Sequence, residues 1–256
     1  MEDRIREAEQ SGVLNLCYLG LSVMPVLPDS IEVLLCTSNN LFSLGKLPKC
    51  LKRLDCWNNM LKELPELPES LTFLNCGSNL LHQLPTLPPG LTELYCSGNR
   101  LSVLPSLPPT LVEFHCYINR LPCLPALPAS LTKLYCYNNR LTEMPTLPDG
   151  LAFLDCFTNR ISVMPVVPAS LTKLYCNNNP WHYAFRELAG NDNKVCLVNA
   201  IHERRASNKI VAKNLYALNR VLTVLSEDVL SVVGSFLSGS VMRVCSQLSA
   251  LRKEMF

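Results

Sequence analysis

Cysteine is the residue of this sequence whose chemistry first needs an explanation, because thirteen are present. Eight of them recur every twenty residues, from Cys36 to Cys176. Thiolates bind zinc, but a period of twenty never produces the short Cys-x-x-Cys pairs of zinc sites. The N-terminus, MEDRIREAEQ, has no apolar signal region, so disulfides are not expected either. We therefore expect a column of reduced, buried thiols that pack like small hydrophobic side chains.

The histidines make no stronger case for catalysis. None has an Asp or Ser at a spacing that would assemble a catalytic triad. The four histidines are His82, His115, His182 and His202. The segment HERRA at 202–206 begins like the zinc-protease motif, but Ala206 stands where the second metal-binding His is required. We predict no enzyme activity, no cofactor and no metal site.

From Ile31 onward the sequence follows one pattern, which we call the template: L-x-x-L-x-C-x-x-N-x-L-x-x-L-P-x-L-P-x-x. Alternation in segments such as Leu134, Tyr135 and Cys136 predicts a short strand with Leu and Cys turned inward. Strands at this spacing leave too little chain for hairpins, so they must stack in parallel as coils of a solenoid. A weaker row at 13–28 is predicted to seal the first coil.

An Asn follows each predicted strand at the corner of the coil. Its amide can bond backbone groups of a neighbouring coil that would otherwise be buried without partners. The predicted structural ladder consists of Asn39, Asn59, Asn79, Asn99, Asn119, Asn139, Asn159 and Asn179.

Proline marks the rest of each repeat, because fifteen of the nineteen prolines fall at two template positions. Each one fixes φ near about −65° and removes a hydrogen-bond donor, so segments such as LPTLP resist both helix and paired strand. We expect an extended, polyproline-like convex face opposite a concave face of short parallel strands. The predicted stack is curved.

Residues 13–180 resemble leucine-rich repeats of the short twenty-residue class, with about nine repeats. The motif L-x-x-L-x-C-x-x-N-x-L carries this resemblance. The LPxLPxxL linkers resemble those of secreted bacterial leucine-rich-repeat effectors, and the strand Cys resembles repeats of large DNA viruses of amoebae. The resemblance implies an α/β repeat solenoid that binds a protein partner.

The template leaves free the residues on either side of the inward Leu and Cys, and these should point outward from the concave face. Aromatic side chains and charges of both signs gather there, as at the centres of protein interfaces. The predicted protein-binding residues are Trp57, Phe73, Tyr95, His115, Tyr117, Lys133, Tyr135, Tyr137, Phe153, Phe157, Lys173 and Tyr175. Stacking between neighbouring strands is the alternative explanation for these rings.

The net charge is +2, from 23 basic and 21 acidic residues, so no overall field attracts nucleic acid or an anionic membrane. No stretch approaches the roughly 18 apolar residues of a membrane span. We therefore expect an intracellular, cytoplasmic protein that binds neither nucleic acid nor membrane. If the protein is viral, we expect it to lie in the host cytoplasm or in the virion.

Residues 181–256 lack both proline and the template, so a domain boundary is expected near 180, after a charged segment at 1–12 and repeats at 13–180. Apolar residues at helical spacing predict a helical region that caps the open end of the solenoid.

Part of this region, LSEDVLSVVGSFL at 225–237 with VCSQL at 244–248, resembles an F-box. The resemblance implies a module at 225–251 that docks on a ubiquitin-ligase adaptor. Its docking residues would be Leu225, Val229, Leu230, Val233, Phe236 and Leu237. Ser226 departs from the family's Pro, and a plain amphipathic cap helix accounts for the same pattern.

Two classes of function remain open. The first is a non-enzymatic protein-interaction module that binds a partner on the concave face and serves as a ubiquitin-ligase substrate receptor if the F-box resemblance holds. The alternative is a structural solenoid within a larger assembly, such as a virus particle.

Overall fold

The computed structural model describes residues 2–180, and the predictions for residues 181–256, including the F-box-like segment, lie outside the described residues. Helix α1 (Glu2–Ser11) is followed by strands of three residues each. The strands are β1 (Val13–Asn15), β2 (Val33–Leu35), β3 (Arg53–Asp55), β4 (Phe73–Asn75), β5 (Glu93–Tyr95), β6 (Glu113–His115), β7 (Lys133–Tyr135), β8 (Phe153–Asp155) and β9 (Lys173–Tyr175).

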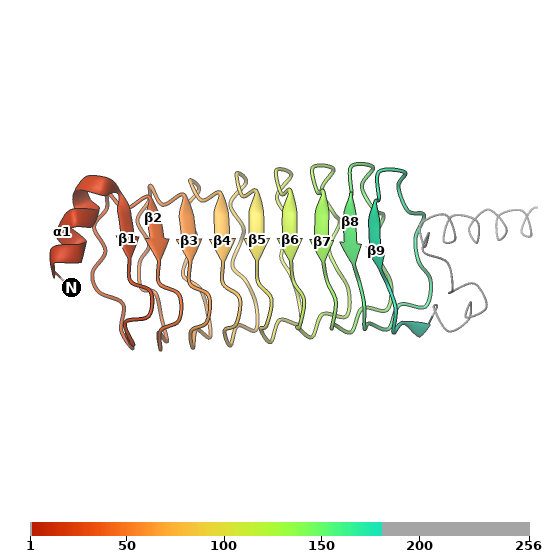
Figure 1. Ribbon diagram of the computed structural model, residues 1–256, viewed down its shortest axis with the longest axis horizontal. Helices are drawn as coiled ribbons and strands as arrows, with labels where there is room; N and C mark the ends of the chain where they lie inside the picture. Colours follow the sequence, from red (N-terminus) through yellow and green to blue (C-terminus); the bar gives the residue numbers. More distant parts are fainter. Residues whose placement is uncertain (1, 181–256) are drawn as a thin grey trace, which may run out of the picture. The chain divides into compact units, whose positions relative to one another are not determined.

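The strands form one parallel sheet in the order of the sequence, from β1 to β9 (Figure 1). Every pairing joins residues twenty positions apart, as in Leu34 with Leu54 and Leu54 with Leu74. The predicted parallel-strand solenoid is confirmed. The twenty-residue repeat sets this register, because a slip of one residue would turn the buried Leu of a strand to the other face.

The core is a set of columns in which each coil contributes the same apolar positions. In the third coil these include Leu51, Leu54, Cys56 and Leu61, all fully buried. Burial of a Leu side chain contributes about 2 kcal/mol, so each coil is stabilised mainly by contact with the coils on either side. Phe114 replaces the strand Leu in β6 and is fully buried as well.

Helix α1 packs against β1 and covers the first coil. Its Ala8 is buried, and Ile5 packs against the same core. Gly12 ends the helix in the left-handed conformation, with φ of 71°, and its N–H donates to the Ala8 carbonyl at 2.8 Å. The segment that we described from sequence as charged is thus a helix that shields the apolar end of the sheet. No helix in residues 2–180 is long and apolar enough to cross a bilayer.

A left-handed residue precedes each ladder Asn, and Tyr18 takes the same conformation before Leu19, which stands in place of the Asn in the first coil. The φ of this left-handed residue lies between 51° and 65° in every coil. The residues are Tyr18, Ser38, Asn58, Ser78, Gly98, Ile118, Asn138, Thr158 and Asn178. This conformation lets the chain turn sharply at the corner, and only glycine adopts it without cost.

Ile118 is the least suited of these residues, because a β-branched side chain crowds the backbone at positive φ. We expect Ile118→Asn to raise the free energy of unfolding by about 1 kcal/mol. Its side chain is 49% exposed, so little burial is lost. The reciprocal change, Asn138→Ile, should destabilise by a similar amount. Chemical denaturation of both variants tests this, and a neutral or reversed pair of effects would contradict it.

Between each corner and the next strand the chain has neither helix nor strand in the described coils. We call the surface formed by these segments, such as residues 62–70, the Pro-rich side. Prolines such as Pro65 and Pro68 remove donors from it, so its backbone cannot continue the sheet.

Candidate functional site

The outward face of the sheet is built from the first and third residue of each strand and the residue two positions further on. The inward Leu or Phe between them is buried in every strand, whereas the flanking residues are half-buried or exposed. We call this surface the sheet face.

Six rings on the sheet face form a continuous row across β4 to β9. The closest ring pair is His115 and Tyr135, with centroids 4.0 Å apart. The successive centroid distances along the row are 5.3 Å, 4.4 Å, 4.0 Å, 4.5 Å and 5.8 Å. The row consists of Phe73, Tyr95, His115, Tyr135, Phe153 and Tyr175. These predicted residues therefore lie together, and we call them the ring row.

A second ring pair lies beside the row. Tyr117 and Tyr137 stack with centroids 4.4 Å apart and planes 7° apart, and Tyr117 also contacts His115 at 6.0 Å. Trp57 and Phe157 are more exposed, at 40% and 38%. Trp57 lies over Gly77, where an added Cβ would approach the indole Cδ1 to 3.1 Å, so a larger residue at 77 would push the indole aside.

Charged side chains order the centre of the row. Glu113 accepts hydrogen bonds from Lys133 Nζ at 2.8 Å and from His115 Nε2 at 2.8 Å when that nitrogen carries its proton. The Tyr95 hydroxyl donates to Glu93 at 2.9 Å. At the Phe73 end of the row, the Arg53 guanidinium lies 3.4 Å from the Phe73 ring centroid and forms a cation–π contact.

Burial and these contacts shift the pKa values of the ionisable side chains at the centre of the ring row. Burial lowers the pKa of His115 below its ordinary value, although the Glu113 hydrogen bond acts the other way. Burial alone would raise the pKa of Glu113, but hydrogen bonds from Lys133 and His115 outweigh it, and its pKa is lowered. Burial and the bond to Glu93 raise the pKa of Tyr95. Near neutral pH the centre therefore holds a neutral imidazole beside a paired carboxylate.

The ladder Asn side chains bridge adjacent coils. In Asn79, Nδ2 donates to the carbonyls of Cys56, at 3.0 Å, and Cys76, at 3.1 Å, while Oδ1 accepts the N–H of Leu61 at 3.0 Å. The same bonds recur from Asn39 to Asn179, and Asn119 and Asn139 are somewhat more exposed than the others. Each amide thus satisfies backbone groups of its own coil and of the coil before it.

Several solved structures are similar to this chain. The chain is 40% identical to YopM from Yersinia enterocolitica WA-314, with a TM-score of 0.64 over 64% of this chain and 37% of YopM. It therefore spans little more than a third of that protein. It is 30% identical to the leucine-rich-repeat domain of a Shigella effector, with a TM-score of 0.53 over 73% of this chain and 79% of that domain. This chain belongs to the leucine-rich-repeat proteins. A scan against protein-family models and a search of curated proteins found no match.

A third solved structure bears on the cysteines of this leucine-rich-repeat protein. The functional domain of InlJ from Listeria monocytogenes, which includes a cysteine ladder, is 28% identical, with a TM-score of 0.54 over 62% of this chain and 38% of that one. Here the cysteines from Cys36 to Cys176 are buried, and all cysteines in residues 2–180 are free thiols. Burial raises the pKa of Cys36 and Cys76 to about 12, so the reactive thiolate is scarce. No three His, Cys, Asp or Glu side chains of this part of the chain gather to hold a metal ion.

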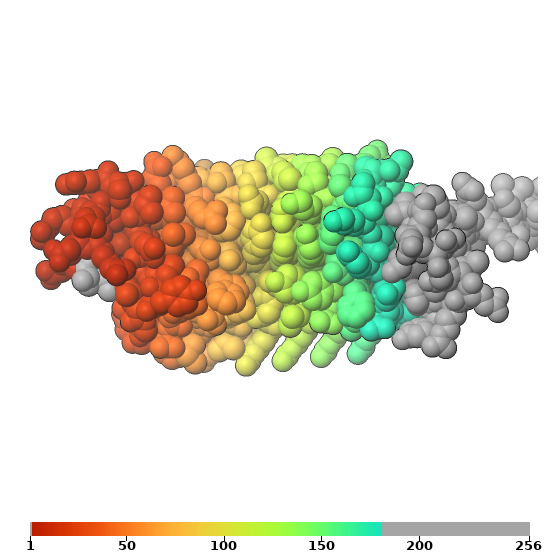
Figure 2. Space-filling view, in the orientation of Figure 1, coloured from red at the N-terminus to blue at the C-terminus, as the bar shows by residue number. Residues whose placement is uncertain are grey.

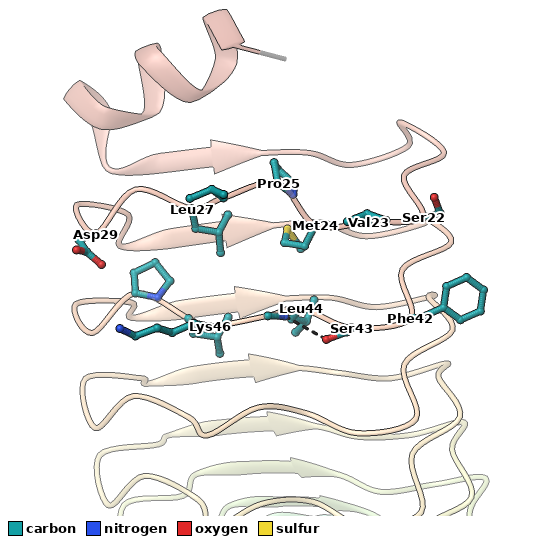
Figure 3. A pocket seen from close by; sticks show the side chains of 14 residues that line it. Ser22, Val23, Met24, Pro25, Leu27, Asp29, Phe42, Ser43, Leu44 and Lys46 are labelled. Carbon is teal, nitrogen blue, oxygen red and sulfur yellow. Dashed lines mark hydrogen bonds between the residues drawn. The ribbon is translucent and has the colours of Figure 1, made fainter.

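Sequence reasoning did not find a cavity of about 580 Å³ on the Pro-rich side, between the first two coils (Figure 3). Gly45, with φ of 66°, stands where the template has proline, and its N–H donates to Ser43 Oγ at 3.2 Å. The missing proline was the signal in the sequence. The lining is largely apolar, and Phe42 stands away from the coils at one end (Figure 3).

A column of arginines was also missed. It comprises Arg100, Arg120, Arg140 and Arg160, which follow the ladder Asn in four successive coils and are all exposed. The repeated pair Asn-Arg was the signal, but the template treated the position as free. In Figure 2 a row of long side chains projects from the lower edge of the array, in its yellow-to-green part.

Proposed function

We propose that this leucine-rich-repeat protein captures another protein on its sheet face and performs no catalysis. The ring row is the observation that carries the proposal. Six rings on six neighbouring strands form an apolar strip about 24 Å long, on a face that the chain does not cover with any other described element. Interfaces between proteins are enriched in such aromatic side chains.

The charged residues beside the strip suit a partner surface that carries both positive and negative charges. Neither Glu93 nor Lys173 forms an ion pair with another described residue, whereas Lys133 pairs with Glu113. A partner that supplies one basic and one acidic group near these positions would complete the pairing. Such rim contacts determine specificity and association rate more than affinity.

The array is rigid enough to hold this surface in place. Each strand is bonded to the next in register, and the Asn side chains add bonds between coils. A preformed surface loses little conformational entropy when it binds. We propose that the partner meets the ring row without rearrangement of the sheet.

The residues after 180 extend the proposal. We infer from the F-box resemblance at 225–251 that this protein presents its captured partner to a ubiquitin-ligase adaptor in the cytoplasm of a cell. The competing proposal, a structural solenoid in a virus particle, draws on the resemblance of the strand Cys to viral repeats. Affinity purification from the native source distinguishes them, since ligase subunits support the first and capsid proteins the second.

The capture proposal is tested by substitutions in and beside the ring row. We expect the triple variant Tyr135→Ala, Tyr137→Ala and Phe157→Ala to weaken binding of the purified partner by about thirtyfold or more, or about 2 kcal/mol. Isothermal titration calorimetry measures the Kd. The loss should appear mainly as faster dissociation, because these side chains supply buried contact area.

Val103→Ala on the Pro-rich side is the matched control, since it also removes an exposed apolar side chain. It should leave the Kd unchanged. Equal losses in both variants, or undiminished binding by the triple variant, would place the binding surface elsewhere. Melting curves of each variant separate lost binding from lost folding.

A further inference from the structure

The arginine column defined above forms a second charged surface, at the corners that follow the carboxyl ends of β5 to β8. The ion pairs in residues 2–180 are Asp3 with Arg6, Glu32 with Lys52, and Glu113 with Lys133, and Glu113 also contacts the neutral His115. None of them involves the four arginines. Glu143 follows Arg140 by three residues, and no ion pair joins them among these contacts.

The backbone fixes the spacing of the column. The N–H groups of Arg100, Arg120, Arg140 and Arg160 donate to the Leu carbonyls of the preceding coils at 2.9, 2.9, 3.0 and 2.8 Å. Successive coils lie about 4.8 Å apart, so the four residues span about 14 Å in a single file. The charges are therefore held in line by the sheet and not by one another.

Like charges on adjacent coils repel, and here only solvent and salt relieve the repulsion. A guanidinium forms its strongest contacts with carboxylates or phosphates, which accept two parallel hydrogen bonds. A row of four therefore fits a linear anion better than an isolated one. A membrane surface is planar, so a single file of arginines on one edge of the array would contact it only along a line.

Spacing distinguishes the linear anions. Carboxylates at positions i, i+3, i+7 and i+10 of an α-helix span about 15 Å, close to the 14 Å of the column. Four carboxylates on one side of an extended chain span about 20 Å, and three phosphate steps along a DNA duplex advance about 10 Å. Tyr117 and Tyr137 stack on each other, so one face of each ring is already occupied and cannot stack on a nucleic-acid base.

We propose that Arg100, Arg120, Arg140 and Arg160 dock an α-helix of a protein partner through an acidic stripe on that helix. The column lies at the corners and not among the ring row, so this surface functions whether or not the sheet face captures a protein. Each arginine pairs with one carboxylate, and the pairing removes the repulsion along the column.

The test uses the full chain, labelled with ¹⁵N, and an Ala-rich helical peptide with Glu at i, i+3, i+7 and i+10. An NMR titration at low salt should shift the amide signals of the arginine coils and give a measurable Kd. Arg120→Gln with Arg140→Gln should weaken binding about tenfold. Lys46→Gln with Lys49→Gln removes the same charge on the Pro-rich side and should leave the Kd unchanged.

Two further probes decide the class of partner. A peptide of the same composition, with its Glu residues spread around the helix, should bind at least about threefold more weakly than the striped peptide. A single-stranded oligothymidine of equal charge should also bind more weakly. Equal binding of the two peptides, equal losses in both double variants, absence of binding, or tighter binding of the oligonucleotide would each overturn the proposal.

Discussion

Phe114→Ala is expected to lower the free energy of unfolding by about 4 kcal/mol, because it empties the centre of the sixth coil. The ring is fully buried and is the largest side chain in the core. Its coil is held on both sides by hydrogen-bonded neighbours, β5 and β7, so the backbone cannot collapse into the space. Denaturation with urea, followed by far-UV circular dichroism, measures the loss.

Phe114→Leu is the matched control. Every other strand from β1 to β9 carries Leu at this position, from Leu14 to Leu174, and the coils above and below accept it. We expect a cost below about 1.5 kcal/mol. If the Leu variant is as unstable as the Ala variant, the sixth coil is adapted to the ring in a way that the repeat does not reveal.

Asn139→Ala should cost about 3 kcal/mol. The side chain accepts the N–H of Leu121 at 3.1 Å and donates to the carbonyls of Cys116 at 2.9 Å and Cys136 at 3.2 Å. Alanine leaves these backbone groups without partners, and an unsatisfied buried group costs about 1–3 kcal/mol. Thermal melting and hydrogen exchange at Leu121 should both report the loss.

The adjacent Asn138 supplies the comparison. It is exposed, and its left-handed φ of 52° makes alanine an unsuitable replacement, because strain would add to any lost contact. Asn138→Gly avoids the strain, as Gly98 does in the fifth coil. We expect less than about 0.5 kcal/mol of change. Similar losses at 138 and 139 would show that the corner, and not the ladder amide, determines stability.

The sequence predicted the sheet because one period repeats with no insertion. Alternation placed Leu134 and Cys136 inside and Tyr135 outside, and the structure has the same pattern. Parallel stacking followed from the short distance between strands. Every one of these inferences depends on position within the repeat, which the letters of the sequence show directly.

Other features depend on geometry that the letters do not show. Ile118 and Thr158 are poor choices for a left-handed corner, so local preference hid a turn that the stacked coils impose. The ring row combines first and third strand positions, as in Phe73 beside Tyr95, and a column-by-column view would separate them. The charged N-terminal segment gave little hint of helix α1, because only Ile5 and Ala8 mark its apolar side.

The Asn bonds have a direction, and this affects how the protein is made. Each amide reaches back to the coil before it, as Asn59 does to Cys36, 23 residues earlier, and to Leu41, 18 residues earlier. A chain leaving the ribosome can close one corner only after the next strand and its Asn have emerged. Folding during synthesis should therefore trail translation by one coil, and a ribosome that pauses leaves a single unfastened coil at the growing end.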